Sequence, residues 1–379
     1  MEGIKHIKEL TEIEGKWVLL RLDLNVPIEN GEVASAFRIE KELPTIRLLQ
    51  EKKARIIAIS HMGDKHASLE PIHSFLSKVL PLEFFPDTFF SDGLRKKVNE
   101  IAPGNILLLE NLRKFSGEEE NEEEIAKQFA SLADVYVNEA FSVSHRNHMS
   151  IVSIPKFLPS YAGMLFMDEV RNLSKALHPE NPFYVVLGGA KIGTKLGLVK
   201  RFLPSAEKIF IYGALAHDLM KERGYEIGKS LADPDPDTDI QNFLSEEKII
   251  LPKDVVVRDE NGNKVTRRAE DVKKEDIILD AGLESVRDIE NAVRGAKTIL
   301  WNGPLGNFEE GFCEGTEMLA AVIGNTTAFS IVGGGDTIAA IDKLNIFEKF
   351  GFVSTGGGAM LDFLAHGTLP GIEALRQRA

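Results

Sequence analysis

Four short glycine clusters in the C-terminal half of the chain each follow an apolar segment that is typical of a buried β-strand. The segments read FYVVLGGAK, TILWNGPLG, AFSIVGGGD and GFVSTGGGA, and they begin at Phe183, Thr298, Ala328 and Gly351. Glycine lets backbone N–H groups approach a ligand closely, and a helix that begins there adds partial positive charge. A strand that ends in glycines and leads into a helix is therefore a candidate anion site. Four of them in one half of the chain predict a phosphorylated ligand.

Apolar and amphipathic segments alternate along the whole chain, a pattern typical of parallel sheets that helices cover on both faces. The strands expected in the first half are Trp17–Asn25, Arg55–His61, Ile106–Glu110 and Val135–Phe141, with helices at Arg38–Glu51 and Glu122–Leu132. The strands expected in the second half are Phe183–Leu187, Lys208–Tyr212, Ile249–Val257, Thr298–Trp301, Phe329–Val332 and Phe352–Ser354. Ligands of such sheets bind beyond the carboxyl ends of the strands, and the polar motifs lie at these ends. The sequence therefore predicts an α/β fold.

A connecting helix is expected near the middle of the chain. Apolar residues with helical 4-3-4 spacing run between Tyr161 and His178, and two prolines then interrupt the pattern. We interpret residues 161–180 as a hinge between an N-terminal domain, residues 1–160, and a C-terminal domain, residues 181–365. An ordinary surface helix within one domain is the alternative.

Composition and charge exclude several classes of function. The 379 residues include 45 Lys and Arg against 58 Asp and Glu, so the formal net charge is −13. This charge argues against nucleic acid or an acidic membrane surface as the partner. The single cysteine, Cys313, excludes an internal disulfide, and no segment is long and apolar enough to span a bilayer. We expect a cytoplasmic enzyme with small-molecule substrates.

Cationic and polar side chains gather at the ends of the strands expected in the first half. They are Arg21, Asp23, Asn25, Arg38, His61, Arg113, His145 and Arg146. Taken alone, any one arginine is explained by a surface ion pair. In a chain of negative net charge, however, arginines that come from several loops indicate a pocket for a small polyanion, because guanidinium groups bind carboxylate and phosphate bidentately.

The glycine clusters of the second half are accompanied by lysine and aspartate. GGAKIGTK places Lys191 and Lys195 four residues apart, on one face of a helix. In GGGDT, Gly333–Gly335 precede Asp336 and Thr337. Asp336 either caps the following helix or holds a magnesium ion that bridges phosphates, and the sequence leaves both open.

Several catalytic motifs are missing. The chain has no Walker A loop, no G-x-S-x-G, no H-E-x-x-H, no C-x-x-C and no G-x-G-x-x-G fingerprint, and the last absence disfavours a nicotinamide-dependent dehydrogenase. The acidic segment Asp233–Asp239 lacks the glycine and the final acid of a calcium loop, so we assign no metal there. Two anion sites without a dedicated nucleophile suit phosphoryl transfer, which depends on alignment and charge neutralisation.

The order of the motifs resembles that of the phosphoglycerate kinases. RLDLNVP, LLLENLR, DVYVNEAF with HR, LGGAK, WNGP, VGGGDT, STGGGA and LPGIEAL follow one another between about Arg21 and Leu375. The resemblance implies two Rossmann-like, doubly wound parallel-sheet domains joined by a hinge helix, with residues 366–379 packing back on the first domain. It also implies reversible phosphoryl transfer from 1,3-bisphosphoglycerate to MgADP, giving 3-phosphoglycerate and ATP, by a cytoplasmic monomer of glycolysis and gluconeogenesis.

The same resemblance assigns roles to residues of this chain. The glycerate substrate would be bound by Asp23, Leu24, Asn25, Arg38, His61, Gly63, Arg113 and Arg146. The nucleotide would be bound by Gly188, Gly189, Ala190, Lys191, Lys195, Asn302, Glu309, Gly334, Gly335, Asp336 and Thr337, with Asp336 holding Mg²⁺ through the nucleotide phosphates. The catalytic residues would be Arg38, Lys195, Gly334 and Gly335.

Some positions depart from the usual pattern of that family. Asp64 replaces an arginine in HMGDK, Thr194 replaces an aspartate, and Glu139 replaces an aspartate in NEAF. The charge reversal at Asp64 predicts a raised KM for the glycerate, unless Lys65 or His66 compensates. A catalytically weak relative that binds a nucleotide or a partner is the alternative class of function.

Overall fold

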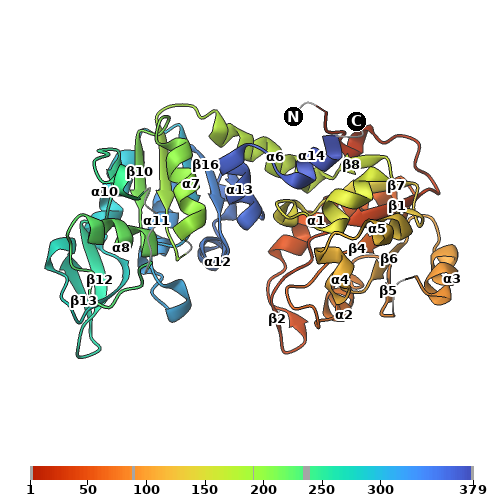
Figure 1. Ribbon diagram of the computed structural model, residues 1–379, viewed down its shortest axis with the longest axis horizontal. Coiled ribbons are helices and arrows are strands. Elements are labelled where there is room, and N and C mark those ends of the chain that lie inside the picture. The colour runs from red at the N-terminus through yellow and green to blue at the C-terminus, as the bar shows by residue number, and fades with distance from the viewer. Residues whose placement is uncertain (1–2, 88–89, 191, 234–239, 377–379) are drawn as a thin grey trace. The chain divides into compact units, whose positions relative to one another are not determined.

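The chain divides into two compact units, each built on a six-stranded parallel sheet (Figure 1). The computed structural model describes residues 3–87, 90–190, 192–233 and 240–376. The first unit is Met1–Arg171 with Thr368–Ala379, and the second is Asn172–Gly367. The predicted α/β fold with two doubly wound parallel sheets is therefore confirmed.

The sheet of the first unit has the strand order β5-β6-β4-β1-β7-β8. In that order the strands are Leu82–Phe85, Ile106–Leu109, Arg55–Ile59, Trp17–Arg21, Val135–Asn138 and Ser160–Ala162. The helices are α1 (Phe37–Glu51), α2 (Glu70–Leu76), α3 (Asp92–Glu100), α4 (Ser116–Glu119), α5 (Glu123–Ala130) and α14 (Pro370–Arg376), and β2 (Ile28–Glu29) and β3 (Glu32–Val33) form a small hairpin. The chain leaves β1 toward β4 and returns to its other side as β7, so the strand order reverses at β1 and β7. Ligands of doubly wound sheets bind at such a reversal.

Strand β1 explains why the sheet is covered on both faces. Val18, Leu19 and Leu20 are all fully buried, although successive side chains of a strand point to opposite faces. A continuous apolar run is what a central parallel strand requires. In Figure 1 the C-terminal helix α14, drawn in blue, lies beside β8 among the elements of this unit, with which it is in contact.

The sheet of the second unit has the strand order β11-β10-β9-β15-β16-β17. In that order the strands are Ile249–Ile250, Lys208–Ile211, Phe183–Leu187, Thr298–Asn302, Phe329–Gly333 and Phe352–Val353. The helices are α7 (Ile192–Phe202), α8 (Gly213–Glu222), α9 (Ile240–Phe243), α10 (Leu283–Val293), α11 (Glu314–Gly324), α12 (Gly335–Leu344) and α13 (Gly358–His366). The order reverses at β9 and β15, the strands that end in LGG and WNGP.

One predicted strand is wrong. Residues Ile249–Val257 do not form a single strand, because Pro252 separates β11 from β12 (Asp254–Arg258). Proline has no N–H to donate and fixes its φ angle, so it interrupts strand pairing. Strand β12 belongs instead to a three-stranded antiparallel sheet with β13 (Lys264–Arg268) and β14 (Ile277–Ala281), which the sequence analysis missed.

The expected connecting helix is present as α6, Met164–Leu177. It begins later than predicted, because Ser160–Ala162 form β8 and pair with β7. The division between the two units, at Arg171 and Asn172, falls within this helix. None of the helices in the described part of the chain has the length and hydropathy of a membrane span.

Candidate active site

Strand β1 ends at Arg21, and the loop that follows it positions Arg38. A carboxylate oxygen of Asp23 lies 3.1 Å from Nη1 of Arg38. The same carboxylate accepts a hydrogen bond from the hydroxyl group of Ser142. The same Nη1 donates to the carbonyl oxygen of Asn25 at 2.8 Å. Arg38 is thus oriented by two loop residues, while 30% of its side chain stays exposed to meet an anion.

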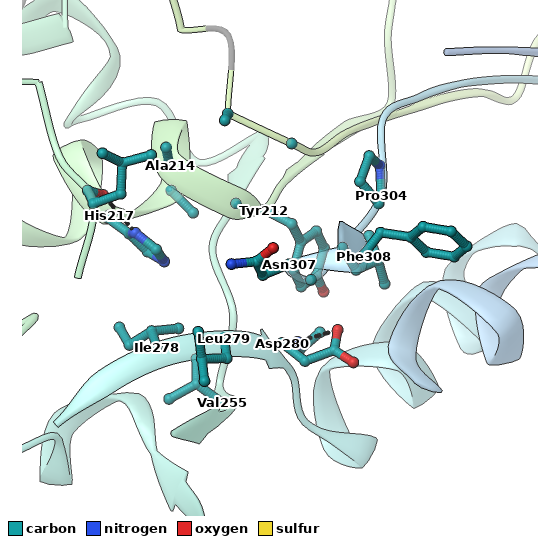
Figure 2. A pocket seen from close by; sticks show the side chains of 18 of the residues that line it. Tyr212, Ala214, His217, Val255, Ile278, Leu279, Asp280, Pro304, Asn307 and Phe308 are labelled. Atoms are coloured by element: carbon teal, nitrogen blue, oxygen red, sulfur yellow. Dashed lines mark hydrogen bonds between the residues drawn. The ribbon is translucent and has the colours of Figure 1, made fainter. Parts of the chain in front are cut away.

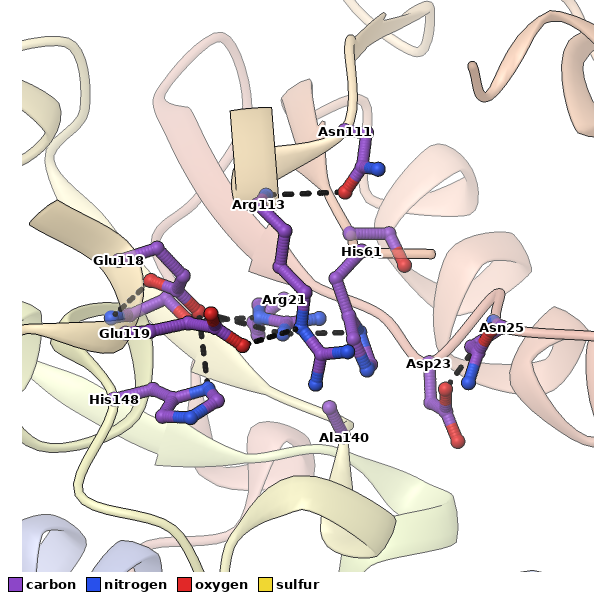
Figure 3. Close-up of polar contacts among 12 residues, drawn as sticks. Arg21, Asp23, Asn25, His61, Asn111, Arg113, Glu118, Glu119, Ala140 and His148 are labelled. Atoms are coloured by element: carbon purple, nitrogen blue, oxygen red, sulfur yellow. Dashed lines mark hydrogen bonds and ion pairs between the residues drawn. The ribbon is translucent and has the colours of Figure 1, made fainter. Parts of the chain in front are cut away.

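The loop after β4 is tied to this arrangement through Gly63. Its N–H donates to Oδ1 of Asn25 at 2.9 Å, and its carbonyl oxygen accepts from Nη1 of Arg113 at 3.2 Å. Figure 3 shows Asp23, Asn25, His61 and Arg113 in this part of the unit, where they come from the ends of three parallel strands. The structure therefore brings together the side chains that the sequence placed at separate strand ends.

His61 is held as a neutral hydrogen-bond donor. Its Nδ1 lies 3.2 Å from Nη2 of Arg21, and because arginine only donates, Nδ1 accepts and the ring proton is on Nε2. Burial, together with the positive charges of Arg21 and Arg113, holds the pKa of His61 well below its usual value. A neutral imidazole with a proton on Nε2 can donate to an anionic ligand.

Arg21 is fully buried and is held by residues that sequence reasoning missed. Its Nε donates to the hydroxyl of Ser150 at 2.8 Å, and Nη2 lies 3.7 Å from the carboxylate of Glu118. Glu118 also accepts the N–H of Ser150 at 3.0 Å and lies 3.8 Å from Nδ1 of His148 (Figure 3). Burial lowers the pKa of His148 to about 4. Glu118 had no sequence signal, since it lies in an acidic run that is typical of a solvated surface.

Asn111 shapes the loop that carries His61, and this residue was also missed. Its Oδ1 accepts the N–H groups of Met62 and Arg113, each at 3.0 Å, and its Nδ2 donates to the carbonyl oxygen of Asp64 at 3.0 Å. Asn111 is fully buried. The sequence did contain a signal for Asn111, because a polar Glu-Asn pair directly follows the wholly apolar strand β6 in LLLENLR.

The remaining residues predicted to bind the glycerate differ in exposure. Arg146 is exposed, and its positive charge helps to lower the pKa of both His61 and Arg113. The side chain of Leu24 is fully buried, and its N–H donates to the hydroxyl of Ser60 at 3.0 Å. Of Leu24, only the main-chain carbonyl is therefore left to meet a ligand.

The carboxylate of Asp64 is used inside its own loop. It accepts the N–H of His66 at 2.9 Å, which is the pattern of an Asx turn. The side chain is exposed, and the loop lies beside Arg113, which bonds the neighbouring Gly63. The acidic residue expected from the sequence thus follows directly after Gly63, whose carbonyl oxygen Arg113 contacts.

In the second unit, the loops after β9 and β15 touch through glycine. The N–H of Gly188 donates to the carbonyl oxygen of Asn302 at 2.9 Å. A Cβ atom at Gly188 would lie 2.0 Å from the carbonyl oxygen of Pro304, and one at Gly303 would lie 2.3 Å from that of Gly188. Any larger residue would separate the two loops, so glycine is required for this close approach.

Lys195 projects from α7 into these loops. Its side chain is buried, and Nζ donates to the carbonyl oxygen of Gly188. Nζ also lies 3.1 Å from the positions that Cβ atoms would occupy at Gly189 and Gly303. The structure thus joins Lys195 to the glycines as predicted from GGAKIGTK. Lys191 and most of the acidic segment, residues 234–239, lie outside the described residues.

Helix α12 begins at Gly335, and Gly334 precedes it with a φ angle of 108°. The N-cap residue is therefore Gly334, so the interpretation of Asp336 as the N-cap is wrong, and Asp336 lies in the first turn instead. The hydroxyl of Thr337 is buried and has no hydrogen-bond partner in the described part of the chain. Nδ2 of Asn302 lies 3.7 Å from the Cβ position of Gly334, so the two loops converge here.

A cavity of about 300 Å³ lies beside these glycine loops (Figure 2). Its glycine-rich end includes Gly189, Gly213, Pro304 and Asp336, and Glu309 also lines it. Its apolar part is formed by Ala214, Met220, Leu231, Val255, Ile278 and Leu279. Pockets that bind small molecules are mainly apolar with a few placed polar groups, and this one has room for a base and ribose. Sequence reasoning missed the apolar part, because the antiparallel sheet supplies much of it.

One polar ring, His217 of α8, is built into the apolar part of the cavity (Figure 2). Its Nδ1 lies 2.7 Å from the carbonyl oxygen of Leu231, so Nδ1 carries the proton of the neutral ring. Burial lowers the pKa of His217. The His217 ring therefore adds no positive charge to the apolar part of the cavity.

One carboxylate of the second unit, that of Asp336, is a candidate metal ligand. Among the described residues, no three His, Cys, Asp or Glu side chains gather into a cluster that could hold an ion by themselves. Asp336 is half-buried and lines the glycine-rich end of the cavity. Mg²⁺ typically binds through one or two carboxylates together with substrate phosphates, so this donor set fits a metal that arrives with a nucleotide.

Two doubly wound units, one with oriented cationic side chains and one with glycine loops beside an apolar cavity, define a nucleotide-binding enzyme of the phosphotransferase class. The family model described as phosphoglycerate kinase matches residues 7–367, and the chain belongs to the phosphoglycerate kinase family. The activity is that of a kinase whose phosphoryl acceptor is a carboxyl group: the glycolytic transfer between 1,3-bisphosphoglycerate and ADP.

Relatives and solved structures agree with this family over almost the whole chain. The phosphoglycerate kinase of Coprothermobacter proteolyticus is 42% identical, over 96% of this chain and 97% of its own length. That of Thermus thermophilus is 40% identical, over 96% and 97%. The structure of phosphoglycerate kinase from Coxiella burnetii superposes with a TM-score of 0.84 at 36% identity, and covers 99% of both chains. That from Pyrococcus horikoshii gives a TM-score of 0.88 at 29% identity, over 99% of this chain and all of its own.

Proposed function

We propose that the two units divide the reaction between them, with the glycerate bound by the first unit and the nucleotide by the second. The support in the first unit is a set of donors aimed from three strand ends, namely Arg38, Arg113 and Nε2 of His61. The support in the second unit is the glycine-rich end of an apolar cavity. A small acid that carries both a carboxylate and a phosphate suits the first set, and a nucleoside diphosphate suits the second.

Arg38, Lys195 and the N–H groups of Gly334 and Gly335 are the proposed catalytic groups. They offer cationic and backbone donors to the three oxygen atoms of the migrating phosphoryl group. The leaving group is a carboxylate and the acceptor is an ionised phosphate oxygen, so no general base is required. Catalysis then depends on donors that are already in place when charge develops in the transition state. The observation that carries this proposal is Arg38, whose guanidinium is fixed by Asp23 and Asn25 while part of it stays exposed.

Asn25 and Gly63 are proposed to contribute through their fixed geometry. The Asn25 side chain is held by the N–H of Gly63, and Gly63 is held in turn by Arg113. A ligand that engages Arg38 and Arg113 would therefore meet a loop that is already ordered. Preorganisation of this kind reduces the entropy that binding costs.

Asp336 is the proposed ligand of Mg²⁺, together with phosphate oxygens of the nucleotide. When bound, the metal neutralises phosphate charge. The role of this chain is to place the Asp336 carboxylate in the first turn of α12, next to the N–H groups of Gly334 and Gly335. The other proposed nucleotide contacts are Gly188, Gly189, Ala190, Lys191, Asn302, Glu309 and Thr337.

Direct transfer needs donor and acceptor oxygen atoms in contact, although the proposed binding loops belong to different units. We propose that bending at α6 closes the site and excludes water from the acyl phosphate. We also propose that the protein works as a monomer in the cytoplasm. The single cysteine suits the reducing conditions of that compartment.

The test is a coupled assay with ATP and 3-phosphoglycerate, run over a range of glycerate concentrations. We expect turnover with a KM for 3-phosphoglycerate that is raised by the charge of Asp64. Binding of nucleotide without any turnover at millimolar substrate would instead support a weak relative with a binding role. Lys195→Ala in the same assay should lower kcat by about 10²–10³ with little change in nucleotide affinity.

A further inference from the structure

Two carboxyl groups are buried behind the loop that positions Arg38. Glu42 lies on α1 and Glu139 follows β7, and neither exposes any surface. Oε1 of Glu42 accepts the main-chain N–H of Asp23 at 3.1 Å. Asp23 is the residue whose carboxylate pairs with Arg38, so Glu42 supports the proposed glycerate site from inside the protein.

Glu139 holds the first turn of α6. Its two oxygen atoms accept the N–H groups of Leu165 at 3.0 Å and Phe166 at 3.3 Å. A Cβ atom at Gly163 would lie 1.8 Å from Oε2 of Glu139, so the carboxylate occupies space that only glycine leaves free. Thr45, one turn after Glu42 on α1, accepts the N–H of Met164 at 2.8 Å. Helix α1 and Glu139 therefore fix the beginning of α6 together.

The charges around these groups do not balance. The groups that act on Glu42 are the carboxylates of Glu139 and Asp23 and the guanidinium of Arg38, which already pairs with Asp23. Those that act on Glu139 are the hydroxyl of Thr45, the N–H groups of α6 and the carboxylate of Asp168. Oε2 of Glu42 is buried without a hydrogen-bond partner among the described residues. An O–H group without a partner is far less unfavourable in such a place than a charge without one.

Burial, then the negative charges of Glu139 and Asp23, raise the pKa of Glu42 well above its usual value. Burial also raises the pKa of Glu139 to about 7. Of the two residues, Glu139 is the one that ionises first, because backbone N–H groups of a helix N-terminus stabilise its carboxylate. The proton therefore belongs on Glu42.

We propose that Glu42 is a positioning residue held as a neutral carboxylic acid, which fixes the main chain of Asp23 and so the orientation of Arg38. This inference rests on the proposed glycerate site of the first unit. Glu42 touches no reacting atom, and it acts through the Asp23 loop. Glu139 is its counterpart, charged above about pH 7, and ties the same region of α1 to α6.

Two substitutions at position 42 separate the roles of shape, acceptor and charge. Glu42→Gln keeps an oxygen acceptor for the Asp23 N–H and is neutral at every pH. Glu42→Leu keeps the approximate volume but removes the acceptor. The KM for 3-phosphoglycerate and kcat of both variants and of the wild-type enzyme are measured at pH 6, 7, 8 and 9 by the coupled assay.

At pH 6 we expect Glu42→Gln to match the wild-type KM within about twofold, because the neutral amide replaces a neutral acid. At pH 9 the wild-type KM should be at least about threefold higher than that of Glu42→Gln, because an ionised Glu42 repels Asp23 and Glu139. Glu42→Leu should raise KM about tenfold at every pH, the usual effect of leaving a buried N–H without its acceptor.

The control is Asp276→Asn in the second unit, where the buried carboxylate accepts from Arg267 at 2.6 Å. This variant should lower the melting temperature without changing the KM for 3-phosphoglycerate. The proposal is overturned if Glu42→Gln raises KM at pH 6 as much as Glu42→Leu does, since the charged form would then be the working one. It is also overturned if both variants leave KM unchanged and lower only the melting temperature. A wild-type enzyme without turnover would instead count against the proposed function, and calorimetric titration of 3-phosphoglycerate into the same variants still tests the positioning role.

Discussion

The two units form their proposed anion sites by different means. In the first unit the donors are side chains, and each is aimed by a second polar group, as the Asp23 carboxylate aims Arg38 and the Gly63 carbonyl oxygen aims the guanidinium of Arg113. In the second unit main-chain N–H groups serve as donors beside Lys195, and their aim comes from the close contact of two glycine loops. A side-chain site is therefore sensitive to changes of charge. A backbone site is sensitive to the addition of a single methyl group.

Removal of Arg38 should have the largest effect on the side-chain site. Arg38→Ala is expected to lower kcat by about 10²–10³, because a preorganised donor to the transition state is lost. The matched control is Arg47→Ala, which removes an exposed arginine from the same helix, α1, and should leave kcat within about twofold. Steady-state kinetics of both variants with saturating substrates provides the check. Equal kcat values for the two would refute the role of Arg38.

Addition of a methyl group at Gly188 is the corresponding change at the backbone site. Gly188→Ala should lower the free energy of unfolding by about 3 kcal/mol, since its Cβ would lie 2.0 Å from the Pro304 carbonyl oxygen and the main chain has to move. Gly335→Ala is the contrasting variant, because its Cβ position has open space within 4 Å among the described residues, its own helix and chain neighbours aside.

Gly335→Ala should therefore keep the wild-type melting temperature and lose activity only if a ligand occupies that space. Thermal unfolding and the coupled assay together distinguish the two glycines. If both variants lose stability equally, the contrast between a glycine needed for packing and one needed for a ligand is wrong.

Reversal of the charge at Asp64 should have a smaller effect, and it separates the role of charge from that of the turn in the side-chain site. Asp64→Arg is expected to lower the KM for 3-phosphoglycerate about fivefold at low salt, because a negative charge near Arg113 becomes positive. Asp64→Asn keeps an oxygen acceptor for the His66 N–H and removes only the charge, so it should give a smaller decrease. A KM that rises in both variants would mean that the turn, rather than the charge, matters for binding.

Acidification should act on the stability of the first unit through a buried histidine, His148. The folded pKa of His148 is about 4, below the usual 6.5, so this histidine stays neutral in the folded protein while it is protonated in the unfolded chain. Stability is therefore fully present above pH 6.5 and falls as the pH drops from 6.5 toward 4. His148 by itself should account for a loss of about 2 kcal/mol between pH 7 and pH 5. Glu139, whose folded pKa is about 7, binds a proton more readily in the folded protein and offsets part of that loss.

The two tryptophans allow this effect to be assigned, since Trp17 is in β1 and Trp301 is in β15. In Trp301→Phe, fluorescence reports the first unit alone. The pH dependence in that background should be reduced by His148→Gln. An unchanged dependence would exclude His148 as its source.

The sequence predicted most of the parallel framework and the residues that line the strand ends. It did so because apolar strands buried on both faces leave a continuous signal, and because Arg38 and Lys195 are near their glycine or strand-end motifs along the chain. It failed where the structure depends on distant partners. Nothing in the sequence shows that Glu118 turns inward to Arg21, or that Val255 and Ile278 from the antiparallel sheet line a cavity beside Gly189.

The error at Ile249–Val257 has a similar cause. The apolar pattern of the segment is continuous except for Pro252 and the two residues after it, and pattern alone does not tell which of two sheets a residue joins. That choice is made by tertiary packing. The capping role considered for Asp336 failed for a more local reason, because α12 begins one residue before Asp336.

The return of α14 to the first unit has a consequence for how the protein is made. The N–H of Gly371 donates to the carbonyl oxygen of Ser144 at 2.9 Å, and a Cβ atom at Gly371 would lie 2.7 Å from the Ser144 hydroxyl oxygen, so the helix seats tightly. The second unit is continuous in sequence, whereas the first is assembled from both ends of the chain. On the ribosome, the second unit can therefore reach its native state while the first unit still waits for α14 to leave the exit tunnel.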